Sequence, residues 1–502
     1  MVIVFVLVAA LVLAVIVTAN WYVWRRLFRD TTRGPGGTRR AGAVLIAGGW
    51  ILAITALVAE RAGAPFWLQQ VLAWPGFLWL ALSIYLLLAV LAGEIVRPLL
   101  RRFLEHRARR TDQGPQPGPE PAPTPDRAGP TEATTADRPP AATVSPGATA
   151  PQTNGGGTPP ATASRPDRGG GTAPATAPAT ASQAGGAGGA TASATAPHPQ
   201  SAPVSDTPEG SAEPSAAPDT ADAVIPTGPS RRLFVSRVVA GAAAAAAVGT
   251  VGYGTYGVLR GPKVKRVTVP LARLPRAAHG YRIAVVSDVH LGPVLGRGFA
   301  QKVVDTINAT QPDLIAVVGD LVDGSVKDLG PAAAPLAQLR ARHGSYFVTG
   351  NHEYFSGAGQ WVEEVRRLGL HPLENARREM PYFDLAGVND VAGEDEGQGP
   401  DFAKALGDRD TARACVLLAH QPVQIHDAVE HGVDLQLSGH THGGQLWPGN
   451  LIASGVNPTL AGLERYGDTQ LYVSRGAGAW GPPTRVGAPS DITLIELASK
   501  QA

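Results

Sequence analysis

The chain has 502 residues, a formal net charge of +2 at pH 7 and one cysteine, Cys415. This length predicts two or three domains, and the small net charge gives no reason to expect nucleic acid as a partner. A single cysteine excludes a disulfide framework and a cysteine-rich zinc site. Cys415 stands in the apolar run "ACVLLAH", which is typical of a buried strand.

Three apolar segments near the N-terminus have the length and composition of membrane-spanning helices. They cover residues 2–19, 41–59 and 74–96, and the first two contain no charged residue. About 20 apolar residues are enough to cross the hydrocarbon core of a bilayer. Buried core helices are the alternative interpretation, but three such runs within the first 100 residues favour membrane spans.

Arginines flank these segments unevenly and predict their orientation. Six lie between the first two segments and six follow the third, whereas only Arg61 lies between the second and third: Arg25, Arg26, Arg29, Arg33, Arg39 and Arg40, then Arg97, Arg101, Arg102, Arg107, Arg109 and Arg110. Basic loops of membrane proteins stay in the cytoplasm. The domain of residues 1–110 is therefore predicted to hold three spans, with the N-terminus outside.

Residues 111–230 form a tract rich in Pro, Ala, Gly, Thr and Ser. It has no aromatic residue, and Ile225 is its single isoleucine. Such a segment buries too little apolar surface to offset the entropy lost on ordering its backbone. We therefore predict a disordered linker.

Residues 231–261 begin with Arg231 and Arg232 and continue into a weakly hydrophobic run rich in Ala and Gly. This segment resembles a twin-arginine export signal placed inside the chain, and the alternative is an ordinary fourth span. Both interpretations carry the chain from the cytoplasm to the outside. The remaining residues, 262–502, are accordingly expected outside the cytoplasm.

The C-terminal 262–502 segment predicts one layered α/β domain. Five short apolar runs have strand length: "RIAVVSD", "DLIAVVGD", "GSYFVTG", "ACVLLAH" and "VDLQLSG". Helical patterns such as "FAQKVVDTINAT" lie between several of them. Alternation of strands with helices is typical of layered α/β folds.

Each of these five runs ends in polar residues that are able to bind metal. The clusters are Asp288-Val289-His290, Gly319-Asp320 with Asp323, Gly350-Asn351-His352-Glu353, His420, and Gly439-His440-Thr441-His442. Ligands of α/β sheets bind beyond the carboxyl ends of the strands, so these side chains are expected to meet at one rim.

The residue types in these clusters indicate which metals the rim binds. Asp, Asn and His without thiolates suit Mn, Fe or Zn, and the set is larger than one tetrahedral metal requires. It fits two divalent metal ions about 3.5–4 Å apart that share a carboxylate.

The ordered motifs D-x-H, G-D-x-x-D, G-N-H-E, a separate H and G-H-x-H resemble the calcineurin-like metallophosphoesterase superfamily. The wording "GNHEYFSG" and "SGHTHGGQLWP" further resembles its membrane-attached bacterial branch. The resemblance implies a four-layer α/β/β/α sandwich, here preceded by α-helical membrane spans and a disordered linker.

The resemblance also implies a role for each motif residue. It assigns Asp288, His290 and His442 to the first metal, Asn351, His420 and His440 to the second, Asp320 to both, His352 to the scissile phosphate as proton donor or charge stabiliser, and Asp323 to the orientation of His352. The remaining histidines of the domain are expected on its surface: His279, His343, His371, His426 and His431.

Some neighbouring residues have more than one interpretation. Trp447 and Trp480 lie in loops after the metal motifs and either shape substrate access or pack the loop. Arg485 is able to pair with a phosphate, although we do not count it as catalytic. Glu353 follows His352 and is a candidate support for the metal ligands.

These observations predict a multi-pass cell-membrane protein that is a metal-dependent phosphohydrolase with an extracytoplasmic catalytic domain. Its substrate is expected to be a phosphomonoester, phosphodiester or pyrophosphate, with a lipid-linked or envelope phosphate suggested by the membrane attachment. Neither nucleic acid nor a particular protein partner is predicted. The alternatives are a membrane signalling or scaffold protein with a low-turnover phosphoesterase-like sensor domain, and a nucleotide phosphodiesterase that faces the cytoplasm.

Overall fold

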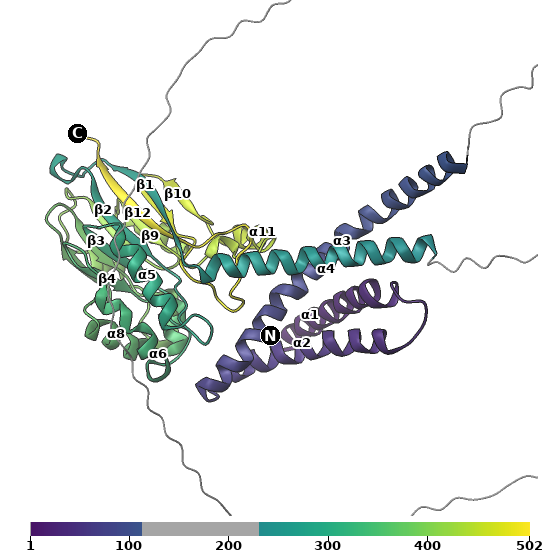
Figure 1. Ribbon diagram of the computed structural model, residues 1–502. Coiled ribbons are helices and arrows are strands. Elements are labelled where there is room, and N and C mark those ends of the chain that lie inside the picture. The colour runs from purple at the N-terminus through teal and green to yellow at the C-terminus, as the bar shows by residue number, and fades with distance from the viewer. Residues whose placement is uncertain (1, 113–229, 502) are drawn as a thin grey trace, which may run out of the picture. The chain divides into compact units, whose positions relative to one another are not determined.

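The computed structural model of the protein describes residues 2–112 and 230–501 (Figure 1). Residues 113–229 of the predicted linker lie outside this range, so the expectation of disorder there stays a prediction. The described chain comprises a group of long helices and an α/β domain.

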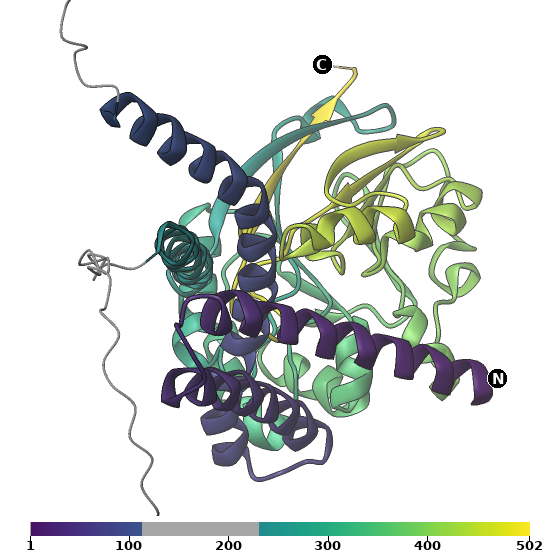
Figure 2. The same ribbon diagram turned by 90° about the vertical axis from the view of Figure 1, so that its right-hand side faces the viewer.

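Four helices in the described residues are long and apolar enough to cross a membrane. They are α1 (Val2–Trp24), which continues into a π-helical turn at Arg25–Arg29, α2 (Gly37–Arg61), α3 (Phe66–Asp112) and α4 (Arg231–Leu259). Helix α3 packs against both α2 and α4 (Figure 2).

The first three helices are longer than the segments predicted at 2–19, 41–59 and 74–96. Helix α3 has 47 residues and contains Pro75 and Pro98. Hydropathy locates only the part of a helix that suits hydrocarbon, whereas backbone hydrogen bonding continues into polar flanks. Each predicted apolar segment lies within one of these helices, and the helix continues beyond it.

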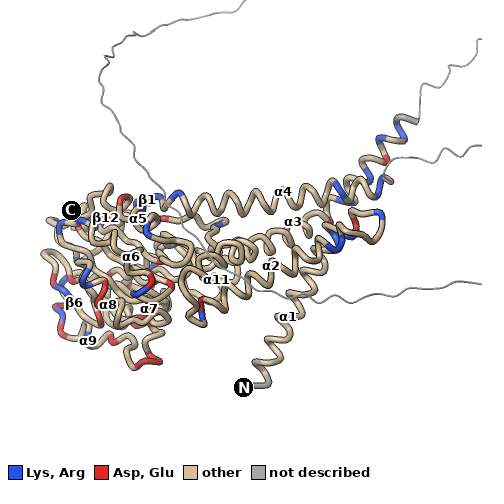
Figure 3. Tube along the Cα trace, turned by 60° about the horizontal axis from the view of Figure 1, so that its bottom comes forward, with Lys and Arg blue, Asp and Glu red and all other residues tan. Residues whose placement is uncertain are grey.

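Arginines gather at one end of these helices (Figure 3). Arg26 forms an ion pair of 2.9 Å with Asp30 and one of 2.7 Å with Glu94 of α3. A cavity of about 610 Å³ beside this pair is lined by Arg97 and Arg232, among other residues. The arginines of the two predicted cytoplasmic clusters and the basic start of α4 thus lie together.

The α/β domain contains two six-stranded sheets among its described residues. The first has the order β1 (Lys263–Leu271), β12 (Asp491–Ser499), β2 (Tyr281–Val286), β3 (Leu314–Val318), β4 (Ser345–Val348) and β5 (His371–Pro372). The second has the order β10 (Gly462–Tyr466), β11 (Thr469–Val473), β9 (Leu435–Ser438), β8 (Cys415–Leu418), β7 (Asp384–Gly387) and β6 (Ala376–Glu379). Strands β2, β3 and β4 are parallel, as are β7, β8 and β9.

Alternate residues of the strands face opposite layers. In β2, Ile283 and Val285 join a buried cluster that includes residues of both sheets, whereas Ala284 and Val286 join the cluster formed with α5 and α8. Helices α5 (Arg297–Ala309), α6 (Val326–Ala333) and α8 (Ala358–Arg367) cover this outer face.

The second sheet repeats this alternation on its own side. Val416 and Leu418 of β8 face the first sheet, and Leu417 joins a cluster with α9 (Phe402–Leu406) and α10 (Ile425–Glu430). Cys415 is buried there as a free thiol. The predicted four-layer α/β/β/α sandwich is therefore confirmed, because side chains of period two place one apolar face against a sheet and the other against helices.

Candidate metal centre

All five polar clusters lie at the carboxyl ends of strands β2, β3, β4, β8 and β9. Three of these strands belong to one sheet and two to the other. The predicted rim is thus a shared edge of two sheets rather than the edge of one. Short helices α7 (Asn351–Ser356) and α11 (Gly449–Val456) follow two of the clusters.

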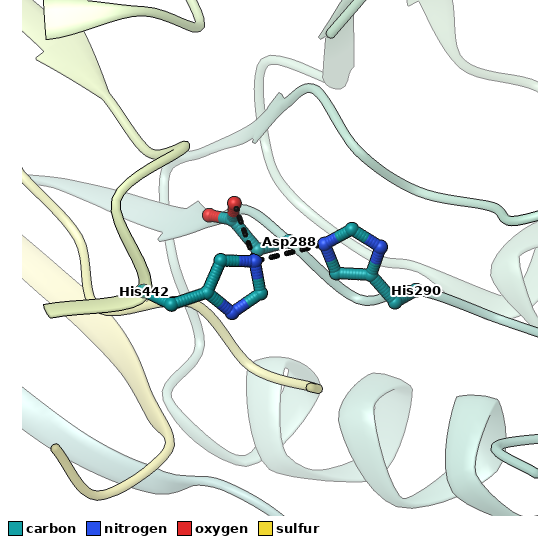
Figure 4. Close-up of side chains that lie close together, drawn as sticks. All are labelled: Asp288, His290 and His442. Carbon is teal, nitrogen blue, oxygen red and sulfur yellow. Dashed lines mark hydrogen bonds and ion pairs between the residues drawn. The ribbon is translucent and has the colours of Figure 1, made fainter. Parts of the chain in front are cut away.

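A first group of potential ligands consists of Asp288, His290 and His442, with one donor atom of each within 4.8 Å of the others (Figure 4). The Nε2 atoms of the two histidines are 2.9 Å apart, and His442 Nε2 is 3.4 Å from Asp288 Oδ1. All three residues are buried. Asp288 Oδ2 has no hydrogen-bond partner among the described residues, as expected of an oxygen available to a cation.

A second group consists of Asp320, His420 and His440, with donor atoms again within 4.8 Å of one another. Asp320 Oδ2 is 3.1 Å from His420 Nε2, and Asn351 Oδ1 is 3.0 Å from His440 Nδ1. The same Asp320 Oδ2 atom lies 3.7 Å from Nε2 of His290, a member of the first group. One carboxylate oxygen thus lies between the two groups.

The hydrogen bonds of two histidines prepare them for metal binding. His290 Nδ1 is 2.8 Å from Asp323 Oδ1, and His420 Nδ1 is 2.9 Å from the carbonyl oxygen of Val318. Both partners are acceptors, so each Nδ1 carries the proton and a neutral ring keeps a lone pair on Nε2. Metal-binding histidines are commonly oriented in this way, and the donor set therefore fits divalent cations.

His352 lies at the edge of the first group. Its Nδ1 atom is 2.7 Å from the same Asp323 Oδ1 that contacts His290. Burial alone lowers the pKa of His352, but the hydrogen bond and the charge of Asp323 raise it to about 9. The aromatic rings of Phe355 and Trp480 lie 5.6 Å and 5.7 Å from its ring. The predicted pair of His352 and Asp323 is brought together.

Glu353 supports the second group through backbone atoms. It is fully buried, and its carboxylate accepts hydrogen bonds from the backbone N–H groups of Asp320, Leu321 and Gly350 at 2.9, 2.7 and 2.6 Å. Burial, followed by the charge of Asp320, raises the pKa of Glu353 to about 7. Its position in the first turn of α7 is the sequence signal for this role, because acidic side chains there cap free N–H groups.

Arg485 holds the ring and the backbone of His442 in place, and because it donates to Nδ1, the proton of a neutral His442 ring lies on Nε2, where a cation would have to displace it. Its guanidinium donates to His442 Nδ1 at 2.9 Å, to the His442 carbonyl at 3.1 Å and to the Gly478 carbonyl at 2.6 Å. Burial lowers the pKa of Arg485 to about 10. The suggestion that Arg485 pairs with a phosphate was wrong for this geometry, because its donors face His442 and backbone carbonyls.

The backbone around the candidate ligands is unusual. Five of them have φ angles between 48° and 72°: Asp288, His290, Asp320, His440 and His442. Non-glycine residues hold this left-handed conformation at a cost of about 1–3 kcal/mol each, and they concentrate at functional sites. The neighbouring glycines Gly319, Gly443 and Gly444 adopt positive φ angles as well.

Two glycines are needed for a different reason, close approach. A Cβ atom on Gly350 would meet Asp320 Oδ1, and one on Gly439 would meet Asp288 Oδ2. Glycine at these positions lets the backbone after β4 and after β9 lie close to the carboxylates of Asp320 and Asp288.

The remaining histidines do not join these groups. In the part of the chain that the structure describes, no group of potential metal ligands includes His279, His343, His371, His426 or His431. The side chains of His279, His371 and His426 are exposed, and His343 Nδ1 lies 2.6 Å from Tyr281 Oη.

Two adjacent groups of Asp and His with a shared carboxylate oxygen define the class of dinuclear metal sites that act on phosphate esters. The model of the calcineurin-like phosphoesterase family matches residues 281–444, a range that contains all nine predicted site residues. Known proteins match about half of the chain.

A metallophosphoesterase of Aquifex aeolicus is 34% identical over 243 residues, covering 47% of this chain and 92% of that protein. A zebrafish transmembrane protein with a metallophosphoesterase domain is 39% identical over 264 residues, covering 50% of this chain and 60% of that protein. Its bovine counterpart is covered to 57%, so this chain spans less than two thirds of these vertebrate relatives. A crystal structure of a zebrafish dimetal phosphatase aligns with a TM-score of 0.32 and 12% identity, over 44% of this chain and 93% of that one.

The chain belongs to the calcineurin-like phosphoesterase family. The family uses a dinuclear metal site, and the described residues contain two candidate groups of ligands for it.

Proposed function

We propose that this protein is a membrane-anchored phosphoesterase whose two divalent metals divide between the two groups of ligands. Asp288, His290 and His442 would hold the first metal, Asn351, His420 and His440 would hold the second, and Asp320 would serve both. The observation that carries this assignment is the position of Asp320 Oδ2, 3.7 Å from His290 Nε2 and 3.1 Å from His420 Nε2. Mn, Fe and Zn all suit nitrogen and oxygen donors without thiolates.

When bound, the two metals would lower the pKa of a water so that it attacks phosphorus as hydroxide. They would also supply positive charge that stabilises the phosphoryl oxygens. The chain itself supplies the proton donor, His352. Its Nδ1 atom is held by Asp323, so its Nε2 atom is left to donate to a phosphoryl or leaving oxygen. The raised pKa, about 9, keeps that proton in place at neutral pH.

Asp323 connects metal binding to proton donation. One of its oxygens contacts both His290 at 2.8 Å and His352 at 2.7 Å. A single carboxylate thus fixes the ring of a metal ligand and the ring that faces the phosphate. The relative position of the two imidazole rings, whose centroids are 4.7 Å apart, is set in part by this one side chain.

The helices support an extracytoplasmic catalytic domain. The arginines beside α1–α3 and at the start of α4 gather at one end of the helices (Figure 3), and basic segments stay in the cytoplasm. Helix α4 runs from this basic end directly into β1 of the α/β domain. We infer a multi-pass cell-membrane protein that hydrolyses a phosphomonoester, phosphodiester or pyrophosphate on the outer side. A C-terminal reporter that is active only in the cytoplasm tests this side, and its activity would overturn the assignment.

Turnover by the full-length protein tests the enzymatic proposal. The detergent-purified chain is loaded with Mn²⁺, Fe²⁺ or Zn²⁺ and assayed on aryl phosphate monoesters and diesters and on pyrophosphate. We expect turnover with one of these metals and a loss of roughly 10³-fold for Asp320→Asn, as is typical when a central catalytic group is removed. The matched control Asp305→Asn changes the same side chain on the exposed surface of α5. Metal-loaded protein without turnover on any ester would contradict the enzymatic proposal and favour a sensor. An active Asp320→Asn variant would contradict the assigned role of Asp320.

A further inference from the structure

An exposed apolar surface follows the last of the five motifs, Gly439–His442, in the chain. We define the α11 patch as Trp447, Leu451, Ile452 and Val456, whose exposed fractions are 50%, 66%, 76% and 76%. Helix α11 has no buried residue and no charged one. Single exposed apolar residues are ordinary on soluble proteins, but a contiguous group of large ones marks an interaction site.

The α11 patch is fixed to the metal centre by backbone contacts. The backbone of Asn450 packs closely against Gly444, two residues after His442. The Trp447 N–H donates to the carbonyl of Val486 at 2.9 Å, beside Arg485. The patch therefore has a defined position relative to the candidate ligand His442.

The same loop packs against α4. Leu446 and Val486 contact the apolar cluster that contains Ala247 and Val251 of this helix. Thr255 Oγ1 lies 2.7 Å from Thr484 Oγ1 in a buried hydrogen bond. The segment that carries the patch is thus packed along the last turns of a membrane-spanning helix.

Aromatic and basic residues indicate where α4 leaves the membrane. Tyr253 and Tyr256 are 79% and 64% exposed, and Arg260 and Lys263 follow them in the chain. Tyrosines flanked by basic residues are typical of the boundary between hydrocarbon and water. Thr255 contacts Thr484, and the Tyr85 hydroxyl of α3 donates to the Trp447 carbonyl at 2.9 Å, so the α11 patch lies beside two helices that are long and apolar enough to span the membrane.

We propose that the α11 patch inserts into the outer interface of the bilayer, and that the metal centre therefore acts on phosphate esters carried by lipids of that leaflet. The bilayer is the occupant because α11 lies beside a membrane span and presents its largest apolar side chains outward, and an exposed apolar helix face binds the membrane interface in proportion to the area that it buries there. This inference rests on the proposed phosphoesterase activity and names its substrate class.

Depth measurement tests the insertion directly. The full-length protein carrying Ile452→Cys is labelled with an NBD fluorophore and placed in vesicles of phosphatidylcholine and phosphatidylglycerol. Cys415 is fully buried, and burial raises the pKa of its thiol to about 12, so it stays unlabelled. The matched control is Lys404→Cys on α9, which is exposed and is drawn far from α4 and α11 in Figure 3.

Three outcomes of this measurement are distinct. Quenching at position 452 by doxyl-labelled lipid, without quenching at position 404, supports insertion. Quenching at position 452 by aqueous iodide alone would show that the patch faces water and would overturn the proposal. Protection from both quenchers would show that protein covers the patch, and would overturn it equally.

Paired substrates test the second half of the proposal. The same vesicles present dioleoyl phosphatidic acid, phosphatidylglycerol or a prenyl pyrophosphate, and each rate is divided by the rate on a water-soluble ester of the same kind. We expect the double variant Leu451→Ser/Ile452→Ser to lower this ratio roughly tenfold, equal to about 1.4 kcal/mol. The control Leu463→Ser removes a half-exposed leucine of β10 and should change the ratio less than about twofold.

Failure of the inference is separable from failure of the proposed function. Wild-type protein that hydrolyses soluble esters but none of the three lipid esters would overturn the lipid assignment and leave the phosphoesterase intact. A ratio that is unchanged in the double variant would also overturn it. Wild-type protein that hydrolyses neither class contradicts both.

Discussion

The two groups of candidate ligands are supported in different ways. In the first group, charged side chains hold the imidazoles: Asp323 contacts His290 at 2.8 Å and Arg485 contacts His442 at 2.9 Å. In the second group, the supporting atoms belong largely to the backbone. The Val318 carbonyl holds His420, and Glu353 anchors the N–H groups around Asp320.

This difference determines how mutation can reach each metal. Support by a side chain is removable without moving the chain, so the first group can be weakened by single substitutions at Asp323 or Arg485. Support through the backbone is altered by changes that move the chain, such as substitution of a glycine, or that leave its N–H groups without an acceptor, such as substitution of Glu353. We therefore expect first-group variants to lose metal while staying folded, and second-group variants to lose metal together with stability.

The largest effect is expected from removal of the ligands themselves. His442→Ala should deplete the first metal and His440→Ala the second, and each should lower turnover roughly 10³-fold because both metals act in one step. Metal content by mass spectrometry should fall from two to one per chain in each variant. His426→Ala, an exposed histidine of α10, is the control. Loss of both metals from either variant would break the division into two groups.

A smaller loss is expected from Asp323→Asn. Replacement of the carboxylate weakens one hydrogen bond to His290 and another to His352, and loss of such a partner typically lowers metal affinity or activity 10–100-fold. The first metal should bind more weakly in a chelator competition, while the second is retained. An unchanged affinity for the first metal would show that Asp323 serves His352 alone.

The backbone-supported group is tested by Gly350→Ala. A Cβ atom there would meet Asp320 Oδ1, and the chain between β4 and α7 must shift to relieve this contact. We expect turnover to fall at least tenfold and the melting temperature of the metal-loaded protein to fall by several degrees, since overpacking typically costs about 1–3 kcal/mol. Gly359→Ala, in the exposed first turn of α8 with open space around its Cα, is the control. A stable Gly350→Ala variant would contradict the contrast between the groups.

The structure brings the nine predicted site residues together because each follows a short apolar strand, and parallel strands bring their carboxyl ends to one edge. Alternation of strand-length apolar runs with helical patterns predicted a layered α/β domain, and the family resemblance added its four-layer arrangement. The order of strands within each sheet could not be predicted from the sequence, because strands that are neighbours in a sheet can be far apart in the chain. Strand β12, at the C-terminal end of the domain, inserts between β1 and β2, and no local pattern specifies that neighbour.

The supporting residues were also hard to find from the sequence. Arg485 lies 43 positions from His442 in a Pro- and Gly-rich loop, where an arginine ordinarily faces solvent. Its burial against backbone carbonyls depends on how the loop folds over the site. Glu353 was easier to suspect because it directly follows His352, but its partners around Asp320 come from another strand. Residues that act through the backbone of distant segments leave little local signal.

The smallest and most discriminating effects should come from two separate conservative substitutions, one at each supporting side chain. Arg485→Lys keeps the charge but not the planar fork that reaches His442 and two carbonyls, so it should weaken the first metal roughly tenfold. Glu353→Gln replaces one accepting oxygen with a donor that faces an N–H group, so a buried polar contact is lost at about 1–3 kcal/mol of stability. We expect Arg485→Lys to release the first metal in preference to the second, and Glu353→Gln to lower the melting temperature and weaken the second metal. Chelator competition and thermal unfolding on the same samples separate these results. Equal effects of the two variants on both metals would mean that Asp320 couples the two groups too tightly for their supports to act separately.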